Sequence, residues 1–467
     1  MFTIIKQQVI DGLRDSLFLF IAVVVLLTFV VNGFVFSDRY HVAREDWERH
    51  NANTIEFLEA RTSNLTVLAR YYQTMVKPAS TLTFIANGGE ERLPNSYSVN
   101  AFLYVNPRLQ NRGNETLPDF LIIDWIFIIG IVLSLQAFML GFRAICGEKR
   151  DGTLRLLMSY SVSRWKLFFG KYVGYLTILL VTFALGASIN LFILNVTGAM
   201  QFTSTTLFVL GWTAIVSVLF ISFVLLFGIA VSSMVRTPAV ALVILMIFWL
   251  FAVIAVPGIA RIIGENAMQV PSESDVSQEI NLARSEIWDN SKEGAGAWYG
   301  DNEYRFTQAA RNRAEVYQAI SASIQNIFNS ADKQRIDQAV LINTIASLSP
   351  YGLMSDALQR LTRQGIYGYS DLKEAARRYQ QQLYSFTKEK DRIDPDSPHN
   401  LYHGVERGGF STKPVELSSI PRSDVLWQSG GLLGDLHVPW MHMVMLMASN
   451  VVMMLVAFIF LLRYDPR

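Results

Sequence analysis

Few side chains in this sequence have the types and spacing that metal or acid–base chemistry requires. His437, Met441 and Met445 fall on one face of an expected helix, and imidazole with thioether sulfur suits Cu(I). Methionines where a helix enters a membrane more often pack, so the cluster is only a weak copper candidate and we expect no metal site. His399 and His403 are four residues apart but lack the intervening glutamate of a zinc-protease helix. No Ser/His/Asp or Cys/His constellation is identifiable, so we expect no catalytic residues.

The sequence also lacks the motifs of nucleotide and nucleic-acid binding. It contains no Gly-x-x-x-x-Gly-Lys-Ser/Thr sequence, and Gly170-Lys171 is followed by Tyr172 and opens an apolar run, so it cannot cradle phosphates. A formal net charge of +1 gives no basic field for nucleic acid. The single cysteine, Cys146, excludes an internal disulfide. We therefore expect this chain not to be an enzyme, and to hold no cofactor of its own.

Composition and hydropathy place the chain in a membrane. Hydrophobic residues make up 51% of its 467 residues, and only 17% are charged. A helix of about 20 apolar residues crosses the hydrocarbon core and satisfies its own backbone there. We predict an all-α polytopic membrane protein with six transmembrane helices, at residues 17–36, 120–140, 172–194, 207–231, 239–257 and 440–462.

The distribution of basic residues orients these spans. Residues 143–171, between spans two and three, hold seven lysines and arginines, whereas residues 195–206, in the next loop, hold none. Short loops rich in Lys and Arg stay in the cytoplasm, so both termini are expected there. The chain then divides into residues 1–36 (N-terminus and span one), 37–119 (extracytoplasmic), 120–257 (spans two to five), 258–439 (extracytoplasmic) and 440–467 (span six and C-terminus).

Both extracytoplasmic segments have mainly helical periodicity, and we expect them to pack on each other. The first is predicted to be mostly helical from 43 to about 75, with a short β-like run at 102–105. The second predicts helices over 303–328 and 332–348, one from Ser349-Pro350 to Gly365, and another from Ser370. Residues 394–434 are rich in proline and glycine and predict an irregular return to span six.

Four polar residues are candidates for intramembrane function. An acid within an apolar run is costly and suggests function, but Asp124 lies near a helix N-terminus, where an anion is favoured, so we favour a structural role. Gln136, Asn190 and Asn450, like Asn32, more often bridge helices than contact substrate, with about 0.6 kcal/mol per hydrogen bond.

The loop between spans two and three has the features of a surface helix under the membrane. Gly152 lets the chain turn, Thr153 can cap a short helix, and Leu154, Leu157 and Met158 form an apolar stripe. Ser163 can cap the next helix, which leads into span three. A partner could push such an element, although a basic loop that only sets topology is an equally good interpretation of the pattern.

The same loop resembles the motif of ABC-2-type permeases. The resemblance rests on Glu148, Gly152-Thr153-Leu154, Ser163-Arg164 and Gly170-Lys171 at matching spacing, and extends to residues 348–352 and 463–467. It implies a bacterial inner-membrane protein whose coupling helix, residues 153–160, docks on a separate ABC ATPase subunit that binds ATP and Mg. Glu148 would be a rim charge of that contact and Leu154 a docking anchor. The implied coupling residues are Glu148, Arg150, Gly152, Thr153, Leu154, Leu157, Ser163 and Arg164.

The leading hypothesis is the permease subunit of an exporter-type ABC transporter, with a second permease copy, identical or homologous, completing the transporter. One alternative is a force-transmitting subunit that acts on other envelope proteins. Another is a permease linked to copper-enzyme maturation, for which His437 and its neighbouring methionines would serve.

Overall fold

The computed structural model describes residues 2–110, 123–154, 163–291, 306–404, 409–424 and 438–463. Within these ranges six helical stretches are long and apolar enough to cross a membrane, which confirms the predicted fold class and number of spans. Span one is α2 (Ser16–Glu59), span three is α8 (Arg164–Val196), span four is α9 (Ser204–Met234) and span six is α17 (Trp440–Leu462). Span two consists of α4 (Trp125–Phe127), η2 (Ile128–Leu133), α5 (Ser134–Gly141) and α6 (Cys146–Arg150). Span five consists of α10 (Pro238–Leu250), η3 (Phe251–Ala255) and α11 (Val256–Ala267).

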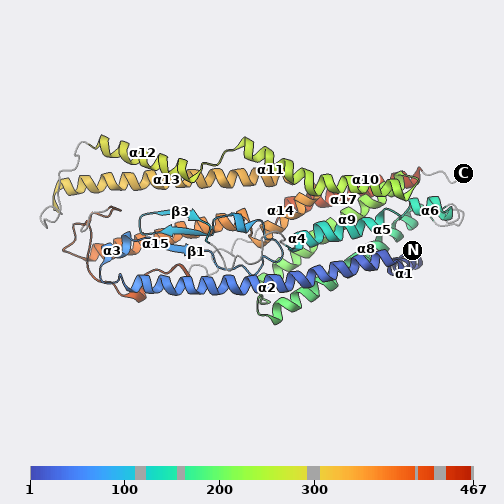
Figure 1. Ribbon diagram of the computed structural model, residues 1–467, viewed down its shortest axis with the longest axis horizontal. Coiled ribbons are helices and arrows are strands. Elements are labelled where there is room, and N and C mark those ends of the chain that lie inside the picture. Colours follow the sequence, from blue (N-terminus) through green and yellow to red (C-terminus); the bar gives the residue numbers. More distant parts are fainter. Residues whose placement is uncertain are drawn as a thin grey trace.

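The molecule is elongated, with two distinct ends (Figure 1). The spans form a bundle at one end, where α1 (Phe2–Arg14) and α6 lie, and we call this the loop end. The small sheet and the helices α3, α12, α13 and α15 occupy the other end, called the domain end.

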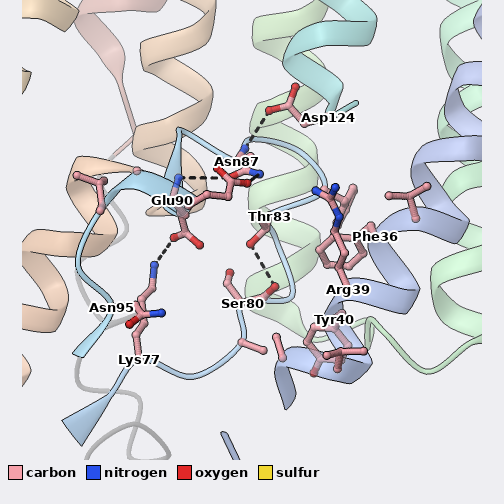
Figure 2. A pocket seen from close by; sticks show the side chains of 18 of the residues that line it. Phe36, Arg39, Tyr40, Lys77, Ser80, Thr83, Asn87, Glu90, Asn95 and Asp124 are labelled. Atoms are coloured by element: carbon pink, nitrogen blue, oxygen red, sulfur yellow. Dashed lines mark hydrogen bonds and ion pairs between the residues drawn. The ribbon is translucent and has the colours of Figure 1, made fainter. Parts of the chain in front are cut away.

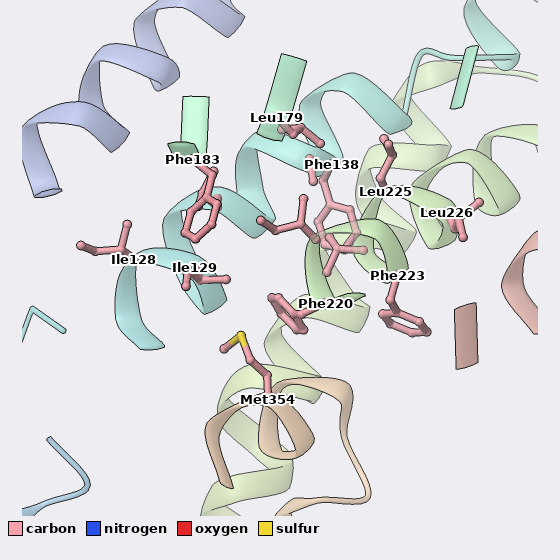
Figure 3. Close-up of a cluster of buried hydrophobic side chains, with 14 of the residues drawn as sticks. Ile128, Ile129, Phe138, Leu179, Phe183, Phe220, Phe223, Leu225, Leu226 and Met354 are labelled. Carbon is pink, nitrogen blue, oxygen red and sulfur yellow. The ribbon is translucent and has the colours of Figure 1, made fainter. Parts of the chain in front are cut away.

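The centre of the bundle is a tight contact between α5 and α9. A Cβ atom on Gly141 would lie 2.9 Å from the Cα of Gly228, so the two backbones touch where neither residue has a side chain. Small residues allow such close approach of helices in lipid. Around this contact, buried side chains of α5, α8 and α9 meet, and Met354 reaches them from the domain side (Figure 3).

Span one continues far beyond the predicted residues 17–36. Helix α2 is 44 residues long, about 66 Å at 1.5 Å per residue, and leaves the bundle toward the domain end. The stretch predicted to be mostly helical, 43–75, is helical from 43 to 59 as a continuation of this helix and again from 65 to 70. No glycine or proline follows Gly33 until Pro78. The ion pair between Arg44 and Glu48 (2.8 Å), which lie one turn apart, stabilises the helix.

The rest of the first segment forms the small sheet. Helix α3 (Leu65–Arg70) precedes β1 (Gln73–Val76), β2 (Ser96–Val99) and β3 (Tyr104–Arg108), which pair antiparallel in the order β1-β2-β3. The predicted β-like run at 102–105 overlaps the start of β3.

The second segment is helical, as predicted, with different boundaries. After α12 (Glu273–Asn290), a single helix, α13 (Gln308–Ala346), replaces the two predicted at 303–328 and 332–348. Helix α15 (Ile366–Ile393) begins before Ser370, whose hydroxyl donates to the carbonyl of Ile366 within the helix (3.0 Å) instead of capping it. One hydrophobic core contains side chains from 58–104 and from 366–420, so the two segments pack together as expected.

Helix α14 (Pro350–Thr362) joins the domain to the bundle. The predicted start is confirmed: Ser349 accepts a hydrogen bond from the Gly352 backbone N–H (2.9 Å). A Cβ on Gly352 would lie 1.9 Å from the Ala346 carbonyl oxygen, so only glycine fits this turn. Leu353, Met354, Ala357, Leu358 and Leu361 pack into the core of the bundle.

Candidate functional site

At the loop end, three cations bind carbonyls at the ends of three other helical segments. Lys149 Nζ donates to the Ser233 carbonyl at the end of α9, and Lys171 Nζ donates to the Ala144 carbonyl just after α5 (2.8 Å). Arg164 Nη1 donates to the Leu461 carbonyl (3.3 Å) and to the Leu462 carbonyl, at the end of α17. The last carbonyls of a helix lack intrahelical partners and attract cations. The two helices that flank the loop, α6 and α8, are therefore bonded to the ends of α5, α9 and α17.

Glu148 and Lys171, both part of the quoted motif, form an ion pair. Lys171 Nζ lies 2.6 Å from Glu148 Oε1, and only 3% of Lys171 is exposed. The Glu148 carboxylate turns inward to neutralise this buried cation, and 23% of its side chain is exposed. Any contact between Glu148 and an ATPase stays a prediction.

The turn after α6 follows the prediction only in part. Gly152 has φ +72°, the left-handed conformation that glycine adopts without strain, so its turning role is confirmed. Thr153 is already helical, and its hydroxyl donates back to the Glu148 carbonyl (3.4 Å) instead of capping a helix. Leu154 is fully buried beside Leu167, Phe168 and other apolar residues of its own chain, so in this structure it is not an exposed docking anchor. Leu157 and most of the proposed coupling helix lie outside the described residues.

The remaining motif residues have clear positions. Ser163 is the N-cap residue of α8 but makes no capping hydrogen bond with its side chain. Arg150 is exposed and pairs with its neighbour Asp151 (2.9 Å). A Cβ on Gly170 would lie 2.7 Å from Ile4 of α1, so this glycine allows α1 to pack on α8.

Helix α1 and Ser232 are the parts of the loop end that the sequence analysis missed. The apolar spacing of residues 4, 5 and 9 is the signal that could have found α1. Ser232 of α9 accepts hydrogen bonds from the Ile145 and Cys146 backbone N–H groups (both 3.0 Å) and donates to the Phe142 carbonyl (3.0 Å). It locks α9 to the start of the loop, and a lone serine in an apolar span gives no sequence signal for this.

Asp124 has the structural role that was favoured. It is the N-cap of α4, and its carboxylate accepts hydrogen bonds from the backbone N–H groups of Phe127 (2.8 Å) and Asn87 (2.9 Å). The carboxylate therefore fixes both the start of span two and the loop that carries Asn87.

The other intramembrane candidates bridge helices, with one exception. Asn190 donates to Asn32 (2.7 Å) and accepts from Trp125 (3.1 Å), which connects spans one, two and three. Asn450 of span six accepts from Ser222 of span four (2.6 Å). Gln136 is fully buried, and its side-chain amide has no hydrogen-bond partner within the described residues.

The weak copper candidate stays untested. Met441 and Met445 are exposed on α17, and His437 lies outside the described residues. Among the residues with a defined placement, no group of three His, Cys, Asp or Glu side chains could hold a metal. The buried histidine of this region is His442, which pairs with Asp356 of α14 (2.7 Å).

A comparison with family models decides the class of this bundle. The model described as ABC-2 family transporter protein matches residues 2–465, nearly the whole chain. The chain belongs to the ABC-2 family. It is thus a multi-pass membrane protein of the permease type, and the family in general works with an ABC ATPase. No curated protein matches this ABC-2 chain.

Removal of the Arg164 side chain from this ABC-2 protein tests the contact between the loop and α17. Arg164→Ala should lower stability by about 1 kcal/mol, because two carbonyls at a helix C-terminus lose their cation. Thermal unfolding of the purified protein should show a lower Tm, and Arg164→Lys should recover part of the loss. An unchanged Tm for Arg164→Ala would mean that the contact contributes nothing.

Proposed function

We propose that this chain is the membrane-spanning subunit of an ATP-driven transporter, and that its loop end receives the stroke of a separate ATPase polypeptide. The observation that carries the proposal is the set of bonds from Lys149, Arg164 and Lys171 to the ends of spans two, four and six. A push on the loop would move these three spans together, because their ends are bonded to α6 and α8, the helices that flank the loop.

The contact surface for the ATPase would be the exposed part of the loop near Arg150. Within the described residues its guanidinium pairs with the adjacent Asp151, and the two side chains are 62% and 54% exposed, so both would be accessible to a partner. ATP and Mg would be bound by that partner. One loop of this kind makes half of a transporter, so a second permease copy, identical or homologous, would complete it.

The loop end would face the cytoplasm of a bacterium, with the chain in the inner membrane. The excess of basic residues in 143–171 supports this orientation. The stroke would then reach the extracytoplasmic domain through α2, which is continuous from the bundle into the domain, and through α14, which packs into the bundle core.

Two observations favour force transmission as the second candidate function. The α5–α9 contact at Gly141 and Gly228 leaves no room between the backbones, and α2 is a single long lever. A closely packed helix contact and a continuous lever suit a subunit that moves its outer domain to act on another envelope protein.

Co-purification tests the proposal. The tagged full-length protein, extracted from its native membrane, should carry a P-loop ATPase in stoichiometric amount, and the complex should hydrolyse ATP. A chain that purifies without any ATPase and hydrolyses nothing in its native membrane would contradict the proposal.

Cysteine labelling tests the orientation. A membrane-impermeant maleimide added to intact spheroplasts should label Leu282→Cys, because Leu282 is 61% exposed on α12, and should spare Arg150→Cys until the membrane is broken. The native Cys146 is buried and serves as the unlabelled background. Labelling of Arg150→Cys in intact spheroplasts would reverse the topology.

A further inference from the structure

A cavity of about 540 Å³ lies where span one leaves the bundle toward the domain (Figure 2). Helix α2 forms one wall, with Phe36, Arg39 and Tyr40, and residues 77–95 form much of the opposite wall. This volume is in the range of small-ligand sites, about 300–1,000 Å³.

The cavity lies at the level of a membrane boundary. The apolar run of α2 begins at Leu17, and Asp38, about 20 residues later, is its first charged residue. Phe34 and Val35, just below, are 60% and 36% exposed on the outside of the bundle, and Val35 also lines the cavity. The cavity therefore has an apolar edge that is open to lipid.

Most of the charged groups in the cavity are already satisfied. Glu90 is paired with Lys77, and Asp124 accepts two backbone N–H groups, including that of Asn87 (2.9 Å). Glu91 accepts a hydrogen bond from the Asn87 side chain. These groups hold the wall together and are not available to bind a ligand charge.

Two neighbouring charges remain uncommitted. Arg39 and Asp38 both line the cavity, and neither forms a hydrogen bond or ion pair with any residue of the described ranges. Arg39 projects from α2 toward the loop that carries Thr83 and Asn87 (Figure 2). A half-buried guanidinium with free donors binds a phosphate best, and a free carboxylate beside it suits an ammonium group.

We propose that this cavity binds a zwitterionic phospholipid of the phosphoethanolamine class. The phosphate lies on Arg39, the ammonium lies near Asp38, and the acyl chains leave past Val35 and Phe34 into the bilayer. With the orientation of the proposed function, this lipid comes from the outer leaflet, so the cavity is where the transporter takes an amphiphile laterally. Binding itself needs no ATPase.

Native mass spectrometry of the purified full-length protein tests the site. The protein is equilibrated in detergent with equal amounts of dioleoyl phosphatidylethanolamine and dioleoyl phosphatidylglycerol. The wild type should retain one phosphatidylethanolamine per chain in preference to phosphatidylglycerol. Arg39→Glu should reduce its occupancy about tenfold or more, equivalent to about 1.4 kcal/mol. The matched control is Arg44→Glu on the same helix, since Arg44 pairs with Glu48 and does not line the cavity, and it should retain the lipid.

A second variant tests lipid binding by filling the cavity, without changing any charge. Ala79 lines the cavity, and Ala79→Trp should fill part of it and displace the lipid while Arg39 stays in place. Unfolding temperatures that match the control verify that both variants fold. Equal retention by wild type, Arg39→Glu and Ala79→Trp would show a non-specific annular lipid only and would overturn the proposal, as would a preference for phosphatidylglycerol. Because no ATPase is present, this outcome is separate from any failure of the proposed function.

Discussion

Lys171→Ala should lower the free energy of unfolding by about 3–5 kcal/mol, because removal of one partner from a buried ion pair leaves the other charge uncompensated. Lys171 is 3% exposed and binds both Glu148 (2.6 Å) and the Ala144 carbonyl (2.8 Å). The loss should appear as a large decrease in Tm of the purified protein and as less protein in the membrane.

A double variant distinguishes stability from coupling. Lys171→Met with Glu148→Leu replaces the pair by apolar side chains, and such replacements are often neutral or stabilising. This variant should recover most of the Tm, yet ATP hydrolysis should no longer drive the transporter, because α8 has lost its bond to the end of α5. A double variant that is as unstable as Lys171→Ala would show that the pair is not the cause of the loss.

Asp356→Ala should be the second variant with a large effect, again about 3–5 kcal/mol. The buried Asp356 carboxylate accepts from His442 of α17 (2.7 Å), Arg360 of α14 (2.8 Å), Tyr367 of α15 (2.7 Å) and Asn343 of α13 (3.1 Å). Its removal leaves His442 buried without its partner and loosens the domain from span six. Glu389→Ala, an exposed acid on α15, is the matched control and should have no measurable effect on Tm.

The stability that the Asp356 network contributes should decrease as the pH falls. Burial by itself raises the pKa of Asp356, but hydrogen bonds from His442, Arg360 and Tyr367 outweigh it and lower the pKa from 3.8 to about 2. A lowered pKa contributes stability that is fully present above the unfolded value and is lost as the pH falls through the folded one. The Tm difference between wild type and Asp356→Ala should therefore shrink between about pH 4 and pH 2. A difference that stays constant over this range would show that Asp356 is not ionised in the folded protein.

The sequence predicted the spans because the bilayer imposes their length and composition. It also predicted the start of α14, where Ser349 caps the helix and Pro350 follows, since both signals are local. The end of helix α2 could not be predicted from hydropathy, because hydropathy marks where a helix leaves the lipid and not where it stops. Helix α2 continues through polar residues that contain no helix breaker.

The roles of the loop residues could not be predicted in the same way. Arg164 binds carbonyls almost 300 positions away, and every residue carries a carbonyl, so no side-chain pattern marks the partner. Leu154 was assigned to an apolar stripe, but periodicity does not say whether an apolar side chain contacts a partner or the protein's own core. The structure places Leu154 in the core.

The most direct test of the account is ATPase association after charge reversal at Arg150. Arg150 and Arg392 are matched, since each is an exposed arginine paired with a nearby acid, with side chains 62% and 73% exposed, one at the loop end and one at the domain end. Neither substitution should change the Tm. Arg150→Glu should abolish co-purification of the ATPase, or leave its ATP hydrolysis uncoupled, whereas Arg392→Glu should retain a stoichiometric, coupled ATPase. A stoichiometric and fully coupled ATPase on Arg150→Glu would contradict the assignment of the loop end as the coupling surface.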